Sequence, residues 1–153
     1  MFLDLGVGNL AEPVSGRAWS QSEIARQVAR RVARFTRSGL SRGDRVFLPF
    51  GNSLEFFAEL LAIWKLGACA VPIDSRLTAF EIRTLVSAAL PRLAVVDHLT
   101  EAAVAEALAD AGVPVVETTQ AGDEEATAGF SQLDDDALIL FTSGSTGAPK
   151  GVV

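Results

Sequence analysis

The chain has 153 residues, 49% of them hydrophobic, and a formal net charge of −6 at pH 7. This length and composition fit one globular domain and exclude a disordered chain. The negative charge argues against nucleic acid as a partner. The single cysteine, Cys69, excludes an internal disulfide and fits a reducing compartment, and its apolar neighbours indicate a buried structural thiol.

The first 18 residues form a leading segment of uncertain structure. Asp4 interrupts its first apolar residues and no basic lead-in precedes them, so we expect no signal peptide. Gly6-Val-Gly-Asn-Leu-Ala11 matches the letters of a dinucleotide-binding fingerprint, but Pro13 would interrupt the helix that must follow. A loop is therefore the better interpretation of this stretch.

A capping box at Ser20 and Glu23 predicts a helix that runs to about Ser38 and stops at Gly39. Helical spacing predicts an inward apolar stripe made of Ile24, Val28, Val32 and Phe35. Four arginines are expected to face away from the core: Arg26, Arg30, Arg34 and Arg37. Such a helix can bind a membrane or a nucleic acid, but the narrow stripe and the acidic chain favour a solvated face.

Strands and helices alternate along the next part of the chain. Strands are predicted at residues 45–49, 68–73, 92–96 and 113–117. Helices are predicted at residues 53–66, 78–90 and 100–112. The first of these three is apolar over most of its surface and should be buried on several sides. The alternation predicts an α/β fold with a mostly parallel sheet and helices on both of its faces.

Three further features of the sequence bear on function. The apolar run from residue 60 to residue 73 contains Lys65 and is too short to span a bilayer, so we expect a soluble cytoplasmic protein without a membrane span. His98 is the only histidine, and no cysteine or acid cluster lies near it in sequence, so it is a weak metal or catalytic candidate. Residues 118–136 are acidic and aperiodic, which predicts an exposed loop.

The strongest functional signal follows an apolar stretch, Leu138–Phe141, which predicts a short buried strand. The next residues are Thr142-Ser-Gly-Ser-Thr-Gly-Ala-Pro-Lys-Gly151. Glycines allow the backbone to turn tightly and approach a ligand, and successive N–H groups in such a turn bind anions. Hydroxyl donors and one lysine suit a polyphosphate. A plain surface turn is the alternative, because Ser, Thr and Gly are common in loops.

The spacing of this loop excludes a P-loop NTPase. If Gly144 is the first glycine of that motif, Pro149 occupies the place of the second glycine. Lys150 is then in the right place, but Gly151 stands where serine or threonine is required.

The loop resembles the phosphate-loop signature of the adenylate-forming superfamily, which includes acyl-CoA synthetases, amino-acid-activating domains of peptide synthetases and luciferases. Three earlier stretches resemble other landmarks of that family in the expected order: residues 39–46, 52–56 and 64–74. The resemblance covers about residues 19–153 and implies the N-terminal part of the large, AMP-binding domain. It also implies that the chain stops just after the phosphate loop.

The resemblance implies ATP-dependent activation of a small-molecule carboxylic acid to an acyl-adenylate, followed by transfer to a thiol. Mg²⁺ would accompany ATP, and coenzyme A or a phosphopantetheine carrier would accept the acyl group. By position, the ATP-phosphate contacts would come from Thr142, Ser143, Gly144, Ser145, Thr146, Gly147 and Lys150.

No complete catalytic set and no metal ligand can be assigned, because the family's other functional residues lie downstream of the loop. We therefore expect the chain alone to be inactive and to need that downstream part, in the same or a separate chain. Val71-Pro-Ile-Asp74 is closer to amino-acid-activating domains, whereas Ala70 favours an acyl-CoA synthetase, which is the preferred type. A stand-alone phosphate-binding or interaction module, or a truncated remnant, is the non-enzymatic alternative.

Overall fold

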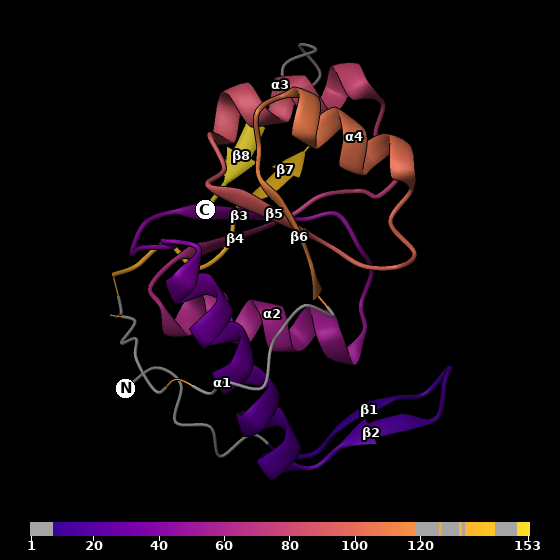
Figure 1. Ribbon diagram of the computed structural model, residues 1–153, viewed down its shortest axis with the longest axis vertical. Helices are drawn as coiled ribbons and strands as arrows, with labels where there is room; N and C mark the ends of the chain where they lie inside the picture. Colours follow the sequence, from indigo (N-terminus) through magenta and orange to yellow (C-terminus); the bar gives the residue numbers. More distant parts are fainter. Residues whose placement is uncertain (1–7, 119–125, 127–131, 133, 143–149) are drawn as a thin grey trace.

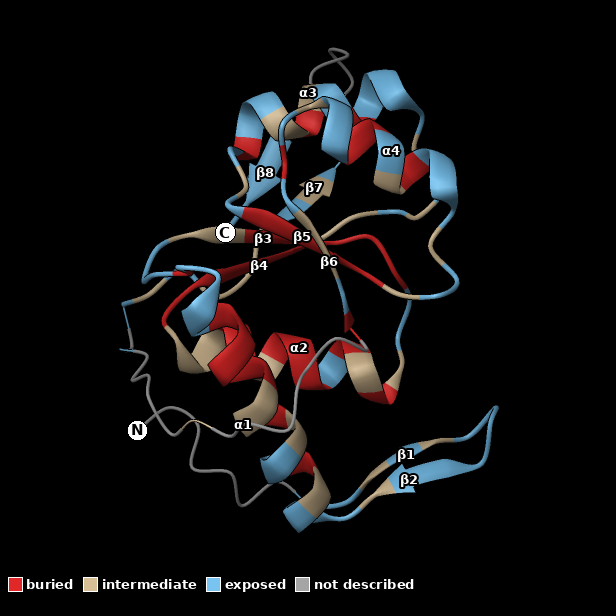
Figure 2. Ribbon diagram, in the orientation of Figure 1, coloured by how far each residue is buried: buried red, intermediate tan, exposed pale blue. Residues whose placement is uncertain are grey.

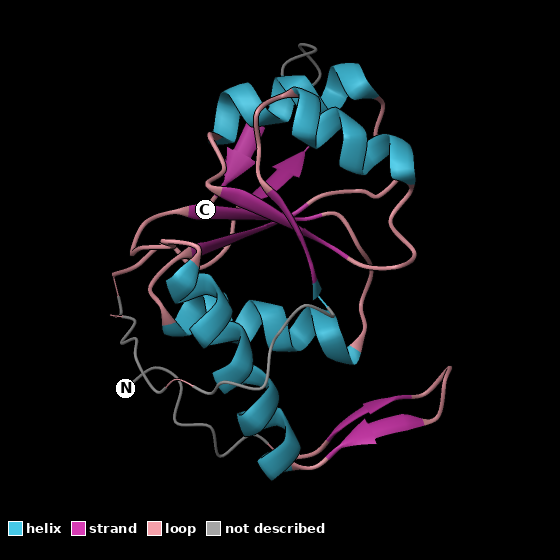
Figure 3. Cartoon of the chain, in the orientation of Figure 1, coloured by secondary structure: helices cyan, strands magenta, loops and turns pink. Residues whose placement is uncertain are grey.

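The computed structural model describes residues 8–118, 126, 132, 134–142 and 150–153. Helices and strands alternate through most of these residues (Figures 1 and 3). In chain order they are β1 (Leu10–Glu12), β2 (Arg17–Trp19), α1 (Gln21–Arg37), β3 (Arg45–Leu48), α2 (Leu54–Lys65), β4 (Cys69–Pro72), α3 (Ala79–Ala89), β5 (Leu93–Val96), α4 (Ala102–Asp110), β6 (Val115–Glu117), β7 (Leu140–Thr142) and β8 (Lys150–Val152).

A four-stranded parallel sheet forms the centre of the molecule, with the strand order β4-β3-β5-β6. Helices α1 and α2 cover one face of the sheet, and α3 and α4 cover the other (Figure 1). This arrangement confirms the predicted α/β fold with helices on both faces. Parallel sheets need such cover because both of their faces are apolar.

Alternating side chains of the strands divide the core into two layers. Val46 and Leu48 of β3 face the α1–α2 layer, whereas Phe47 faces the α3–α4 layer. All three side chains are fully buried. Figure 2 shows the strands of this sheet mostly buried and the outer sides of the helices exposed. The predicted stripe of α1, from Ile24 to Phe35, lies in the first layer as expected.

Of the four helices in the described part of the chain, three begin with a side-chain cap where the sequence predicts a helix start. Ser20 and Thr78 form complete capping boxes, and Ser53 accepts a hydrogen bond from the backbone N–H of Phe56. The prediction that Thr100 starts α4 is wrong. The N-cap of α4 is Glu101, which makes no side-chain cap bond, because the Thr100 hydroxyl instead donates to the Asp97 carboxylate at 2.8 Å.

The prediction that Arg34 faces away from the core is wrong, although Arg26 and Arg37 are exposed as expected. Arg34 and its neighbour Arg31 are buried because they flank the apolar stripe of α1 and point toward α2. Both guanidinium groups bind the fully buried Glu59 carboxylate of α2. Buried charges need such partners, since an unpaired charge would lose its hydration without compensation.

The chain after β6 joins the same buried cluster. Thr118 is only 3% exposed, and its hydroxyl donates to Glu59 at 2.7 Å. The same hydroxyl accepts a bond from Arg31 at 3.2 Å, and Arg34 donates to the backbone oxygen of Glu117 at 3.0 Å. The predicted exposed loop therefore does not begin at Thr118. Most of residues 119–133 lie outside the described residues.

The leading segment contains an antiparallel hairpin of β1 and β2, which extends away from the body of the molecule (Figure 1). Leu10 and Ala11 therefore belong to a strand, and β2 rather than a helix follows it, so these residues are not part of a dinucleotide-binding turn. In the part of the chain that the structure describes, no helix is both long and apolar enough to cross a membrane.

Candidate phosphate-binding site

The two ends of the predicted phosphate loop lie side by side on a hairpin. Strands β7 and β8 pair antiparallel, with Thr142 opposite Lys150. The Thr142 hydroxyl lies 3.5 Å from the backbone oxygen of Lys150. Thr142 and Lys150 are thus the two predicted site residues that the structure describes. Ser143, Gly144, Ser145, Thr146 and Gly147 lie outside the described residues.

The prediction of a buried strand at residues 138–141 is wrong in both the position of the strand and its burial. Leu138 makes a single parallel bridge to Ala70 of β4, and strand β7 begins two residues later. Leu140 is 49% exposed, because β7 pairs with β8 outside the four-stranded sheet and has only one packed face. The apolar run is therefore half-buried, and it leads the chain from the edge of β4 into the hairpin.

The packed face of the hairpin holds it against the α3–α4 layer. Ile139 and Phe141 contact the core cluster that contains Phe47 and Val71. A Cβ atom at Gly151, opposite Phe141, would lie 3.1 Å from the Ile139 side chain and 3.4 Å from the Phe141 ring. Glycine at this position lets β8 lie close over these two side chains.

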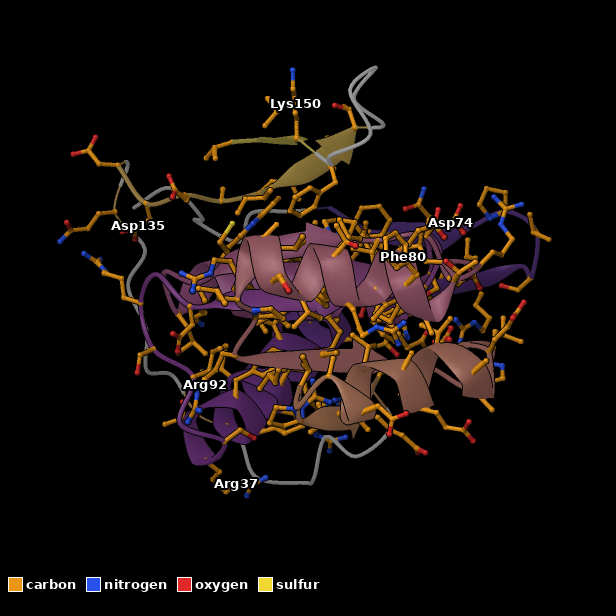
Figure 4. The ribbon with its side chains drawn as sticks, turned by 90° about the horizontal axis from the view of Figure 1, so that it is seen from above. Arg37, Asp74, Phe80, Arg92, Asp135 and Lys150 are labelled. Carbon is orange, nitrogen blue, oxygen red and sulfur yellow. The ribbon has the colours of Figure 1, made fainter. Side chains whose placement is uncertain are left out.

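The open face of the hairpin carries the polar groups of the candidate site. Thr142 and Lys150 are both exposed, and the Lys150 side chain points away from the sheet (Figure 4). Among the described residues, Lys150 has no carboxylate partner in any ion pair. The Lys150 ammonium group and the Thr142 hydroxyl thus lie at the two ends of a loop rich in Ser, Thr and Gly. Such a combination of a cation and hydroxyl donors suits a multiply charged anion.

Two other candidate residues, Cys69 and His98, belong to other parts of the fold than the hairpin. Cys69 is buried in β4, and burial together with the charge of Asp136 raises the pKa of its thiol to about 11. A thiol in this state is a poor nucleophile, in keeping with the structural role that its sequence predicts. His98 is exposed between β5 and α4. Within the described part of the chain, no group of three or more His, Cys, Asp and Glu residues could hold a metal ion.

Sequence reasoning missed the residues that hold the hairpin in place. The Trp64 indole N–H donates to the backbone oxygen of Ala137 at 2.6 Å, and Arg42 pairs with Asp135 at 3.3 Å. Trp64 lies within a stretch already singled out as a landmark, but the stretch alone did not identify what it contacts. Such long-range contacts have no periodic signal in the sequence.

A sequence profile of the family described as AMP-binding enzyme matches residues 9–153. A hybrid PKS-NRPS synthetase, mycA of Thermothelomyces thermophilus, is 32% identical over 93% of this chain and 4% of its own length. The long-chain-fatty-acid–CoA ligase FadD13 of Mycobacterium tuberculosis is 34% identical over 77% of this chain and 26% of its own length.

A crystal structure of ATP-bound MatB from Rhodopseudomonas palustris superimposes with a TM-score of 0.81. It is 29% identical in sequence, and the match covers 97% of this chain and 32% of that protein. The chain thus spans about a third or less of each of these relatives. Since the family profile covers nearly all of the sequence, the chain belongs to the family of AMP-binding, adenylate-forming enzymes.

Proposed function

We propose that this chain supplies the phosphate-binding loop of an ATP-dependent ligase of the acyl-CoA synthetase type. The ligase would convert a carboxylic acid to an acyl-adenylate and then transfer the acyl group to coenzyme A. One observation carries the proposal. The stretch from Thr142 to Gly151 joins the two strands of an exposed hairpin in a member of the adenylate-forming family, and its only cation is free of carboxylate partners among the described residues.

The proposed chemistry requires stabilisation of a leaving group. The carboxylate attacks the α-phosphate of ATP, the bond to the β-phosphate oxygen breaks, and negative charge builds on the departing pyrophosphate. Hydroxyl groups and a cation placed at that charge lower the barrier, because they are already oriented when the charge develops. Lys150 and the Thr142 hydroxyl are the described groups that can take this role.

Mg²⁺ would reduce the repulsion between the phosphates of bound ATP. We assign none of the described residues as its ligand, since none belongs to a group that could hold a metal ion. The residues of this chain would therefore bind and orient the phosphates. The adenine and the carboxylic acid would be bound by the part of the ligase that follows residue 153.

An amino-acid-activating adenylation domain is the second candidate. The hybrid PKS-NRPS synthetases among the relatives favour it, and a carrier-bound phosphopantetheine would then replace coenzyme A as the acceptor. Both candidates use the same phosphate loop. They differ in the acid that drives exchange of pyrophosphate into ATP, an amino acid in one case and a fatty or other simple acid in the other.

The chain contains two lysines, Lys65 and Lys150, which provides a control matched in charge. Binding of MgATP to the 153-residue chain should weaken at least about tenfold in Lys150→Ala, because a hydrogen bond to a charged group is worth roughly 1.5–3 kcal/mol. Lys65→Ala, which removes the last charge of α2, should bind like the unmodified chain. Equal affinities in the two variants would contradict the assignment of the loop.

Activity separates the enzyme from the non-enzymatic alternative. The chain alone should not exchange pyrophosphate into ATP, and exchange should appear when the downstream part of a related ligase is added. Binding of MgATP without any such rescue would favour a stand-alone phosphate-binding module. Exchange by the chain alone would refute the expected inactivity.

A further inference from the structure

The chain that leads into the β7–β8 hairpin is hydrogen-bonded to the edge of β4 and to the end of α2. The backbone oxygen of Ala137 accepts two hydrogen bonds, from the Trp64 indole at 2.6 Å and from the backbone N–H of Ala70 at 3.0 Å. Two residues later, the N–H of Ile139 donates to the backbone oxygen of Ala70 at 2.9 Å. Residues 137–139 thus run parallel to β4 at the edge of the sheet and pair with it through a single bridge.

A second attachment lies just before this point. Asp135 pairs with Arg42 at 3.3 Å, and its carboxylate also accepts the backbone N–H of Gln132 at 2.7 Å. Gly67, which follows α2 with a φ of +69°, lies against the same carboxylate, and a Cβ atom there would be 2.9 Å from its oxygen. Figure 4 shows Asp135 on the chain that rises toward the hairpin.

The groups that make these attachments come from two of the three family landmarks that precede the phosphate loop. Arg42 belongs to residues 39–46, and Trp64, Gly67 and Ala70 belong to residues 64–74. The two stretches also contact each other, since the N–H of Gly43 donates to the backbone oxygen of Gly67 at 2.9 Å. We call Arg42, Trp64 and Gly67 the anchor.

The hairpin depends on the anchor because its other contacts are few. Ile139 and Phe141 pack on the core, but Leu140 and Val152 on its other face are 49% and 60% exposed. Among the described strands, β7 and β8 pair with each other and with no third strand. A two-stranded hairpin is marginal in water by itself, so its orientation is fixed by whatever holds its root.

We infer that Arg42, Trp64 and Gly67 are positioning residues that dock residues 135–139 onto β4 and thereby fix the hairpin that carries Thr142 and Lys150. The docking itself does not depend on the identity of the ligand. Its consequence for phosphate binding rests on the proposed function. None of the three residues needs to touch ATP for the inference to hold.

Two glycines allow a matched test. Gly67 and Gly112 both follow a helix with positive φ, at +69° and +80°, but an added Cβ at Gly112 would meet nothing within 4 Å. Alanine should cause similar backbone strain at both positions, whereas only Gly67→Ala should also displace the side chains of Asp135 and Arg42, which pair with each other. Exchange of the Ile139 and Ala70 amides with deuterium reports the docking, and exchange of the Ala94 amide in the central sheet reports global unfolding.

We expect the two reporter amides to exchange about tenfold faster in Gly67→Ala than in Gly112→Ala, with Ala94 alike in both. Adding Asp135→Ala to both glycine variants should reduce that difference, since the nearest clashing atom is gone and only the Arg42 side chain, at 3.2 Å, remains close to the added Cβ. Equal exchange in the two single variants, or an equal rise at Ala94 and the reporter amides, would overturn the inference.

A second variant covers the case in which Gly67→Ala does not fold. Trp64→Phe keeps an aromatic ring but removes the indole donor, and should speed exchange at Ile139 and Ala70 about fivefold, the effect of one ordinary hydrogen bond. Trp19→Phe, which changes the chain's other tryptophan in the α1–α2 layer, should leave both amides unchanged. Unchanged exchange in Trp64→Phe would count against the anchor.

These measurements need no nucleotide, so they separate the two proposals. If the exchange results are as expected but MgATP binding is insensitive to Lys150→Ala, the anchor stands and the phosphate assignment fails. If Lys150→Ala weakens binding but the reporter amides do not respond to the anchor variants, the phosphate assignment stands and the anchor fails.

Discussion

Helix α2 carries two glutamates one turn apart, of which one is buried and the other is partly exposed to solvent. The Glu59 side chain is fully buried and binds Arg31 and Arg34 of α1. The Glu55 side chain is 25% exposed and binds Arg17 of β2 through two hydrogen bonds, at 2.9 and 2.7 Å. We call Glu59 with Arg31 and Arg34 the inner cluster, and Glu55 with Arg17 the outer cluster. Each cluster holds another element against α2.

The two clusters differ in whether water can replace the arginine partners of the carboxylate. Water can replace Arg17 at the surface, so the outer cluster contributes little to folding. Water does not reach Glu59, whose Oε1 accepts bonds from Arg31 and from the hydroxyl of Thr118. Burial lowers the pKa of Arg31, because the loss of hydration of the guanidinium group outweighs the opposing attraction of Glu59. The inner cluster joins α1, α2 and the end of β6.

The largest effect should come from removing the inner charge. Glu59→Gln leaves two buried guanidinium groups without a carboxylate, and breaking a buried pair in this way costs about 3–5 kcal/mol. Glu55→Gln, the matched change one turn away, should cost less than about 1 kcal/mol. Urea unfolding followed by circular dichroism gives both free energies of unfolding. Similar losses in the two variants would show that burial does not distinguish the clusters.

This cluster also shows where the sequence was informative and where it was not. Apolar spacing and caps predicted the helices, because those signals are local. The burial of Arg34 depends on α2 and on the chain after β6, which lie beside α1 only after folding. A signal was nevertheless present: an acid within a helix predicted to be buried on several sides must have cationic partners, and α1 offered arginines at the spacing of one helical turn.

The candidate site also has one part that the sequence predicted and one part that it did not. The run from Thr142 to Gly151 is contiguous, so its likeness to a phosphate loop was readable from the sequence alone. Its support is not contiguous, because Arg42, Trp64 and Gly67 meet residues 135–137 only through the fold. The burial of Leu138–Phe141 was misjudged for a related reason: an apolar run does not reveal whether one or both of its faces will be covered.

At acid pH the outer cluster should lose its smaller contribution to the free energy of unfolding. The hydrogen bonds from Arg17 hold the pKa of Glu55 below its ordinary value of 4.5, so the unfolded chain takes up the proton first as the pH falls. The contribution of this pair is therefore complete above about pH 4.5 and is lost as the pH falls through the lower pKa of the folded chain. Arg17 also binds the Glu12 carboxylate at 3.0 Å and lowers its pKa, so Arg17→Gln removes both pairs. The free energies of unfolding of the unmodified chain and of Arg17→Gln should draw together as the pH falls below 4.5, from a gap at pH 7 of less than about 1 kcal/mol. A gap that does not narrow as the pH falls below 4.5 would exclude these ion pairs as its cause.

Salt should produce the smallest effect and the sharpest contrast between the two clusters. The Debye length falls from about 10 Å at 0.1 M salt to about 3 Å at 1 M, so exposed charges are screened while buried ones are largely protected. The gap between the unmodified chain and Glu55→Gln should therefore shrink toward zero in 1 M NaCl. The gap for Glu59→Gln should stay nearly constant, because no ion can enter between Glu59 and the two arginines that cover it. A Glu59→Gln gap that shrinks as much as the Glu55→Gln gap would mean that solvent reaches the inner cluster, and that α1, α2 and the end of β6 are held together less rigidly than their packing indicates.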